Sequence, residues 1–147
     1  MATTEIDCVV RPAGRDDLLA VLAVHAQRDA RREATLAASA VERATWERMM
    51  ASRDLVVYLA ELHGEPVGTA TSMVMPNVTC GCAPTAFIEA VVVVAHQRCR
   101  RVASQLIRRI FADTRDTGCN KVQLLSHKRH STDGAPALQL SGLRSRG

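Results

Sequence analysis

The feature that most constrains the fold is the segment 91–110, VVVVAHQRCRRVASQLIRRI. A run of valines typical of a buried strand is followed by a short basic turn and then by apolar residues at helical spacing. A strand, a tight turn and a helix N-terminus are the parts that cradle a phosphate, although such turns usually contain glycine, which lets the backbone approach the ligand. The pattern predicts a strand joined directly to a helix. It leaves a phosphate site, an altered phosphate site and simple strand–helix packing as alternatives.

Periodicity elsewhere predicts a single domain, residues 1–147, of the α/β (α+β) class. Strands are expected at 6–10, 55–62, 67–75, 87–94 and 121–126, and helices at 18–26, 40–52 and 100–117. A turn between the second and third strands makes them an antiparallel hairpin, whereas the helical connection between the last two makes those two parallel. We therefore expect a mixed, largely antiparallel sheet flanked by helices.

The helices are expected to bury one side each. The inner residues predicted are Leu18, Leu19 and Leu22 in the first helix, Trp46 with Met49 or Met50 in the second, and Val102, Leu106, Ile107, Ile110 and Phe111 in the third. Gly118 stands where a helix stop belongs.

Composition indicates the cellular compartment and whether the protein spans a membrane. The chain of 147 residues contains no apolar run long enough for a membrane span, and its N-terminus lacks the pattern of a signal peptide. The five cysteines are odd in number and scattered, which favours reduced thiols. We therefore expect a cytoplasmic protein without a membrane partner.

Charge is distributed unevenly along the chain. Residues 1–95 hold 8 Lys and Arg against 12 Asp and Glu, whereas residues 96–147 hold 11 against 3. The basic second part favours an anionic partner, either a phosphorylated cofactor or nucleic acid, and a solvated arginine-rich face is the alternative. Aromatic content of only 3% leaves few platforms for stacking bases, so a nucleic-acid-binding module ranks last among the functions considered.

Four further segments carry a resemblance to a known family. They are RPA with Asp16 and Asp17, EPVGTA at 65–70, IEAVVV at 88–93 and GCNKV at 118–122. With the segment 91–110, they make the chain similar to the GCN5-related N-acetyltransferase (GNAT) superfamily over most of its length. The resemblance implies an N-acetyltransferase that uses acetyl-CoA as cosubstrate, with the primary amine of a small molecule as acceptor.

The resemblance also identifies a cofactor turn. The family motif is Gln or Arg, two residues, Gly, one residue, and Gly or Ala. It aligns here with Arg98, Cys99, Arg100, Arg101, Val102 and Ala103. The implied cofactor-binding residues are these six with Ser104, and with Val91, Val92 and Val93 of the preceding strand. Arg101 replaces the central glycine, so it either blocks the pyrophosphate or binds it. If residue 101 needs a positive φ, arginine costs about 1 kcal/mol or more there.

Glu89 is the candidate catalytic base, because it lies in an otherwise apolar strand beside the implied thioester. Burial would raise the pKa of this carboxyl toward the working pH, and a directly bound or water-bridged amine would then lose its proton to it. The alternative is a structural glutamate with a backbone or arginine partner. The resemblance further implies that backbone N–H groups around Val91–Val93, freed by a bulge or by splaying strands, hold the carbonyl oxygen.

The C-terminal part departs from the family. Relatives often carry a Phe-Tyr pair whose tyrosine protonates the leaving thiolate, but here Leu138 and Gln139 stand nearest, and water is the remaining proton source. The two strands that usually end the fold are expected to be missing, which would expose a sheet edge and invite a homodimer. A frameshift is one hypothesis for this ending, to be decided by the codons of the gene. A catalytically degenerate relative that binds CoA weakly or not at all is therefore the alternative to an active enzyme.

No metal site is expected. Cys80-Gly81-Cys82 is a single pair of cysteines, without the second pair of ligands that a structural zinc site requires.

Overall fold

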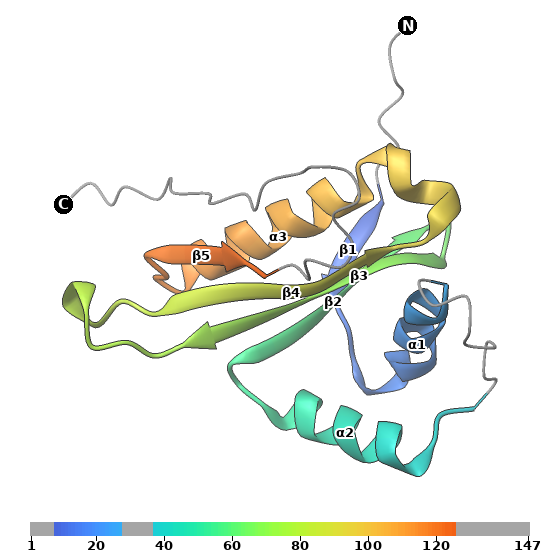
Figure 1. Cartoon of the computed structure of the whole chain (residues 1–147), viewed down its shortest axis with the longest axis horizontal. Helices are drawn as coiled ribbons and strands as arrows, with labels where there is room; N and C mark the ends of the chain where they lie inside the picture. Colours follow the sequence, from blue (N-terminus) through green and yellow to red (C-terminus); the bar gives the residue numbers. More distant parts are fainter. Residues whose placement is uncertain (1–7, 28–36, 126–147) are drawn as a thin grey trace, which may run out of the picture.

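Five strands form one sheet in the order in which they follow along the chain, β1-β2-β3-β4-β5. The computed structural model describes residues 8–27 and 37–125 (Figure 1). The strands are β1 (Val9–Pro12), β2 (Leu55–Leu62), β3 (Glu65–Met75), β4 (Thr85–Val93) and β5 (Lys121–Leu124). The α-helices are α1 (Leu18–Ala26), α2 (Ala40–Ala51) and α3 (Val102–Asp116), and the short 3-10 helices are η1 (Arg15–Asp17), η2 (Cys80–Cys82) and η3 (Ala95–Arg100).

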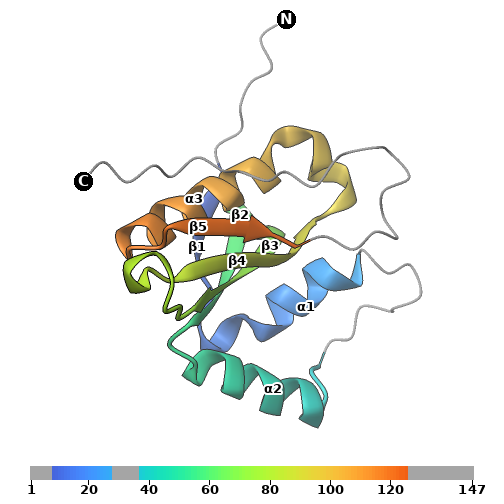
Figure 2. The same ribbon diagram turned by 60° about the vertical axis from the view of Figure 1, so that its left-hand side comes forward.

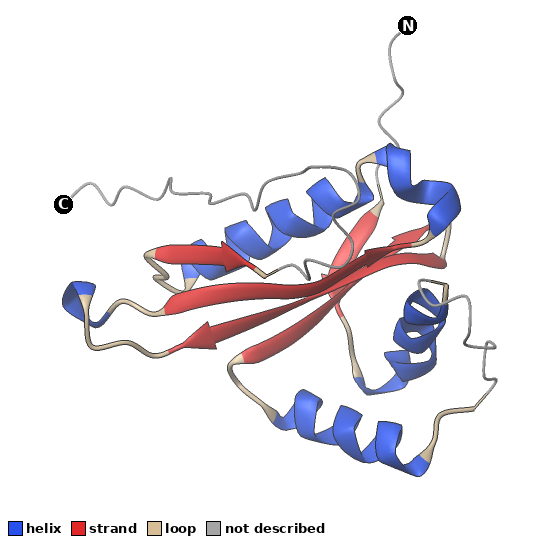
Figure 3. Ribbon diagram, viewed as in Figure 1, coloured by secondary structure: helices blue, strands red, loops and turns tan. Residues whose placement is uncertain are grey.

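The sheet is antiparallel except at its last pair, where β4 and β5 run parallel. Figures 1 and 2 show α3 on one side of the sheet and α1 with α2 on the other, and Figure 3 shows the same two layers of helices around the strands. This arrangement confirms the fold class expected from the sequence, including the parallel pair around the connecting helix.

Alternation along β2 divides the core between the two layers, because successive side chains of a strand point to opposite faces. Tyr58 and Ala60 join the cluster that contains the buried face of α3. Val57 and Leu59 instead pack in a second cluster with Trp46 of α2 and Val21 of α1. The buried residues of α3 are Val102, Leu106, Ile110 and Thr114, which confirms the apolar stripe predicted for it.

Local chemistry explains where the helices begin and end. Ser39 and Glu42 form a capping box at the start of α2, in which each side chain accepts from the other residue's backbone N–H. At the end of α3, Gly118 adopts φ 81°, and the N–H of Cys119 donates to the carbonyl of Thr114 at 3.1 Å. This is the Schellman arrangement, so the helix stop predicted at Gly118 is confirmed.

Three sequence expectations are corrected. The inner residues of α1 are Val21 and Val24, whereas Leu19 is 48% exposed, because the helix turns a different side toward the sheet. The first strand continues through Pro12 instead of ending before it. The third helix begins at Val102, since the preceding residues form η3. The expectations for residues 126–147, including Leu138, Gln139 and the missing last strands, lie outside the described residues.

Within residues 8–27 and 37–125, no helix combines the length and the apolar character that crossing a bilayer requires.

Candidate functional site

A bulge interrupts the pairing of β3 and β4 near the middle of β4. Thr71 pairs with Glu89 on one side of it and Thr69 pairs with Val92 on the other, so that two residues of β4 stand opposite Ala70 alone. Ala90, the first of the two, has φ 53°. A bulge of this kind disturbs the regular ladder and turns the strand, which re-aims its backbone groups. The bulge that the sequence left as one of two alternatives is therefore present.

The bulge also exchanges the two faces of β4. Before it, Ile88 is buried in the cluster beneath α3, and Glu89 points to the face that carries α1 and α2. After it, Val91 and Val93 are partly buried and pack against the α3 cluster, while the side chain of Val92 is 5% exposed. Because these valine side chains are used for packing, a ligand at this place would meet mainly the backbone of β4.

β5 runs beside only the first part of β4. The pairing of the two strands extends from Thr85 with Lys121 to Ile88 with Leu124, and the N–H of Leu125 donates to the carbonyl of Ile88 at 2.8 Å. The bulge and the end of β4 thus lie past the described part of β5, in the direction of η3 (Figure 1).

The basic turn ends in a left-handed residue. Arg98, Cys99 and Arg100 complete η3, and Arg101 follows with φ 61° and ψ 22°. This conformation is the one that glycine adopts readily and that most other residues adopt at a cost. Arg101 therefore occupies the backbone conformation of the glycine that it replaces, and its own side chain is exposed.

The start of α3 offers backbone donors without a competing side chain. The first intrahelical bond runs from the N–H of Gln105 to the carbonyl of Arg101 at 3.1 Å, no side chain caps the helix, and its first turn contains no acid. The N–H groups of Val102, Ala103 and Ser104 precede that bond, and the positive end of the helix dipole lies there. Such a turn suits an anion.

Gly68 sets the position of this helix start. A Cβ at residue 68 would lie 2.9 Å from Val102 Cγ1, 3.1 Å from Leu106 Cδ1 and 3.3 Å from the carbonyl oxygen of Val92. Only a glycine lets α3 approach β3 this closely. The sequence presented Gly68 only as part of a family-like segment. The contact itself has no local sequence signal, because it joins residues far apart in the chain.

Glu89 lies on β4 directly before the bulge, and its side chain is exposed. The burial expected for this carboxyl is therefore wrong, because no described helix covers this part of the sheet face. None of its side-chain contacts with the described residues is a hydrogen bond or an ion pair. The carboxylate is therefore open to a ligand on the face of α1 and α2.

Tyr58, the one tyrosine in the sequence, is engaged elsewhere. Its side chain is 3% exposed beneath α3, and its hydroxyl donates to Asp113 Oδ2 at 2.7 Å. Burial, and next the hydrogen bond to Asp113, raise the pKa of Tyr58 well above its usual range. Asp113 belongs to the C-terminal half of α3. The phenol of Tyr58 is therefore held in the core against that half of the helix, away from the start of α3.

Cys80 and Cys82 lie in η2, at the end of β4 opposite η3 (Figure 1). Both are exposed free thiols. Within residues 8–27 and 37–125, no group of three or more His, Cys, Asp or Glu side chains is placed to hold a metal ion.

Comparison with known proteins covers most of the chain. The model of the acetyltransferase (GNAT) family matches residues 19–138. No curated protein matches the sequence significantly.

Solved structures share the fold. A protein of Agrobacterium tumefaciens assigned as an acetyltransferase is 30% identical, with a TM-score of 0.73 and 82% of each chain covered. Glucosamine-6-phosphate N-acetyltransferase from Arabidopsis thaliana is 18% identical, with a TM-score of 0.68 and 84% of each chain covered. Aminoglycoside N-acetyltransferase AAC(6')-Iy, solved with CoA, is 19% identical, with a TM-score of 0.68 and coverage of 88% of this chain and 83% of its own. The chain therefore belongs to the acetyltransferase (GNAT) family, which confirms the family, the fold class and the N-acetyltransferase class expected from its sequence.

Proposed function

We propose that the protein transfers the acetyl group of acetyl-CoA to the primary amine of a small molecule. One observation carries the proposal: the bulge of β4 and the uncapped start of α3 lie at the same end of the sheet, held together by the close contact of Gly68 with Val102. The first can bind a carbonyl oxygen and the second a phosphate, and in acetyl-CoA these two groups lie at the two ends of the pantetheine arm. The CoA complex of the aminoglycoside N-acetyltransferase, which shares the fold, supports this choice.

The described residues fit a pyrophosphate. We assign it to backbone N–H groups of the turn formed by Cys99, Arg100, Arg101, Val102, Ala103 and Ser104, with Arg98 preceding them. The left-handed backbone at Arg101, the absence of a capping side chain and the lack of an acid in the first turn of α3 support the assignment. The exposed side chain of Arg101 leaves the core undisturbed and adds a positive charge near the turn.

Acetyl-CoA supplies an activated acetyl group and a thiolate leaving group, and the chain supplies a proton acceptor for the amine and the orientation of the reacting groups. Backbone N–H groups at the β4 bulge, around Val91–Val93, are the proposed donors to the carbonyl oxygen. Glu89, whose side chain points to the α1 and α2 face of β4, accepts the proton of the acceptor ammonium, directly or through water. Water protonates the leaving thiolate, since Tyr58 is held by Asp113.

Two further proposals concern the cellular location and the oligomeric state. Cys80, Cys82 and Cys119 are free thiols, which supports a cytoplasmic location. A homodimer through a strand edge of the sheet stays a prediction; β1 and β5 are the outer strands of the described sheet.

The test combines a calorimetric titration of acetyl-CoA with an assay of CoA release across a panel of amines. Saturable binding and amine-dependent release support the proposal, and Glu89→Gln should reduce release without reducing binding. Binding without release for any amine would favour the degenerate relative. Loss of binding that Arg101→Gly restores would identify Arg101 as the obstacle. Salt-dependent binding to random DNA, with none to CoA, would replace the proposal by a nucleic-acid-binding module.

A further inference from the structure

We infer that the acceptor is an amphipathic monoamine, with one amino group at the end of an aliphatic or aromatic body. This inference rests on the proposed function and adds the chemical class of the acceptor. It comes from an apolar surface on the α1 and α2 face of the sheet, which we call the methionine surface: Met73, Met75, Phe87 and Leu125.

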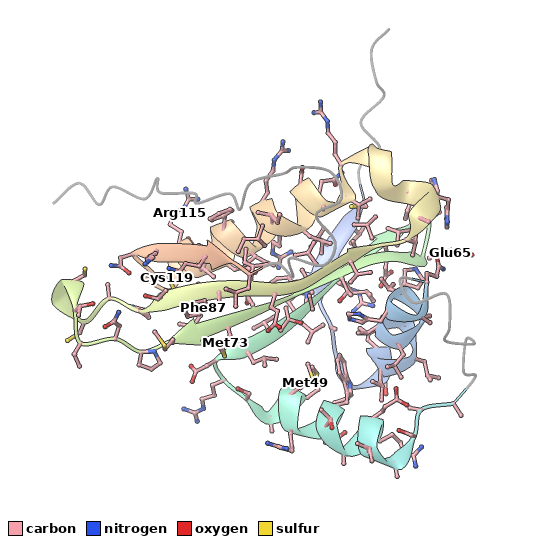
Figure 4. All side chains as sticks on the ribbon, in the orientation of Figure 1. Met49, Glu65, Met73, Phe87, Arg115 and Cys119 are labelled. Carbon is pink, nitrogen blue, oxygen red and sulfur yellow. The ribbon has the colours of Figure 1, made fainter. Side chains whose placement is uncertain are left out.

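The methionine surface lies mainly on β3 and β4. Leu125 adjoins it just beyond β5, and the β5 residue that pairs with Phe87 on this face is the uncharged Gln123. Met73 and Phe87 are paired residues of β3 and β4, so their side chains are direct neighbours on one face. Met73 is 45% exposed, Met75 is 43% exposed and Leu125 is 48% exposed. Figure 4 shows Met73 and Phe87 on their neighbouring strands, with Met49 of α2 on the same side of the sheet.

Glu89 lies at one end of this surface. Thr71 pairs with it on β3, and Phe87 precedes it on the same face of β4. Leu125 follows β5 beside it, since the N–H of Leu125 donates to the carbonyl of Ile88. The carboxylate therefore has uncharged neighbours on both adjacent strands, and the apolar residues extend from it away from the bulge.

The charges on this face suit one amino group and not several. Glu89 is the acid that faces this surface from β4, whereas Lys121, at the start of β5, pairs with Thr85 on the same face and is exposed. Along β4 and β5, a polycation would meet the carboxylate of Glu89 and then the positive charge of Lys121 beyond Phe87. A monoamine would place its ammonium at Glu89 and its apolar body on Met73 and Phe87.

Methionine is well suited to such a role. Its side chain is unbranched and polarisable, so it adapts to ligands of different shape and contacts aromatic rings favourably. Met49 and Met50 of α2 are partly buried and pack against the second core cluster, and they extend the same chemistry toward the helix layer. The surface is therefore expected to accept a range of apolar bodies, with the amino group as the common feature.

The binding test uses the full chain labelled with 13C at its methionine methyl groups, without acetyl-CoA, in an NMR titration. The sequence contains five methionines, so each signal can be assigned by substitution. Hexylamine and 2-phenylethylamine are compared with ethanolamine and with the polycation kanamycin. We expect the two apolar amines to shift the signals of Met73 and Met75 saturably, at concentrations about tenfold lower than ethanolamine requires.

Two variants locate the effect. Met73→Gln should weaken the binding of both apolar amines by roughly tenfold, the scale expected for part of a buried methionine side chain. Val78→Gln is the matched control, because Val78 is 90% exposed in the connection between β3 and β4, and it should change nothing.

Several outcomes would overturn the inference. Kanamycin or ethanolamine binding as tightly as hexylamine would remove the apolar selectivity. The absence of any shift with the apolar amines would show that something else covers the surface, residues 126–147 included. A shift of the Met73 signal with protein concentration alone would assign the surface to a second copy of the chain. The proposed function fails separately, if these amines bind as expected and no acetyl transfer to any amine occurs.

Discussion

The backbone of Gly68 lies directly against the side chain of Val102, so closely that a Cβ at residue 68 would come within 2.9 Å of Val102 Cγ1. Leu106, one turn later, lies almost as near. The first turns of α3 therefore rest on β3 with no side chain of β3 between them. Because the same helix start carries the proposed phosphate-binding turn, this contact sets the position of that turn relative to the bulge of β4.

Gly68→Ala is expected to lower the free energy of unfolding by about 1–3 kcal/mol, the usual cost of overpacking a filled site. It should also weaken acetyl-CoA binding, because α3 has to move outward. Urea denaturation and calorimetry measure the two effects. Gly14→Ala is the control, since a Cβ there meets Asp17 Oδ2 at an ordinary 3.7 Å. Unchanged stability of Gly68→Ala would show that α3 does not lie this close to β3.

Arg101→Gly is expected to raise the free energy of unfolding by about 1 kcal/mol, because glycine adopts the left-handed conformation of residue 101 without strain. The reverse change at another turn provides the comparison. Gly64 has φ 79° and open space around its Cβ position, so Gly64→Ala should lower stability by a similar amount through backbone strain alone. A destabilised Arg101→Gly would contradict the left-handed assignment.

Glu89→Gln is expected to lower kcat by roughly a hundredfold, the lower range for loss of a general base. The melting temperature should stay within about 1 °C of the parent, because the side chain is exposed, and exposed substitutions away from special features change stability little. Glu65→Gln, at the exposed hairpin end of β3 labelled in Figure 4, removes a carboxylate remote from the bulge and should leave kcat unchanged. Equal losses in both variants would argue against Glu89 as the base.

Tyr58→Phe is expected to leave kcat unchanged and to lower the free energy of unfolding by about 1–3 kcal/mol at neutral pH, because the phenol donates to the charged Asp113. The pKa of Tyr58 is raised in the folded protein, so the folded state holds the phenolic proton more tightly than the unfolded state does. The stabilisation is therefore fully present below the unfolded pKa, about 10, and is lost as the pH rises above it.

The check is to compare unfolding of the parent and of Tyr58→Phe between pH 7 and pH 11. The difference between the two should shrink as the pH rises above about 10, since only the parent's unfolded state is then stabilised by ionisation of a phenol, whereas its folded state keeps the phenolic proton. A strong loss of kcat with retained acetyl-CoA binding would instead make Tyr58 a candidate for the general acid.

Most helices and strands could be predicted, because the sequence patterns that specify them are local. The apolar stripe of α3 and the strand β2 follow directly from residue spacing, and Gly118 ends α3 as expected. The inner face of α1 was predicted wrongly. Its residues are apolar almost all round, so periodicity did not indicate which side meets the sheet, and packing placed Val21 and Val24 inside.

The candidate site was predictable only in part. Arg101 was identified from its place in the turn, yet whether its backbone is left-handed depends on how η3 meets α3. The positive φ of Ala90 has no sequence signal, since alanine rarely adopts it, and the neighbouring strand imposes it through the bulge. The burial of Glu89 was predicted wrongly, because burial depends on which elements cover a strand and not on the residues beside it in sequence.

By itself the sequence determined the order of the elements and the family, and it predicted the residues of the proposed cofactor turn, because these depend on periodicity and on residue types at fixed spacing. The tertiary structure alone decided how closely α3 approaches β3 at Gly68. It also decided that the hydroxyl of Tyr58 donates to Asp113 and that the exposed Glu89 lies beside the methionine surface. Each of these is a contact or an exposure created by segments distant in the chain. Such relationships arise only when the sheet has paired and its two layers of helices have packed against it.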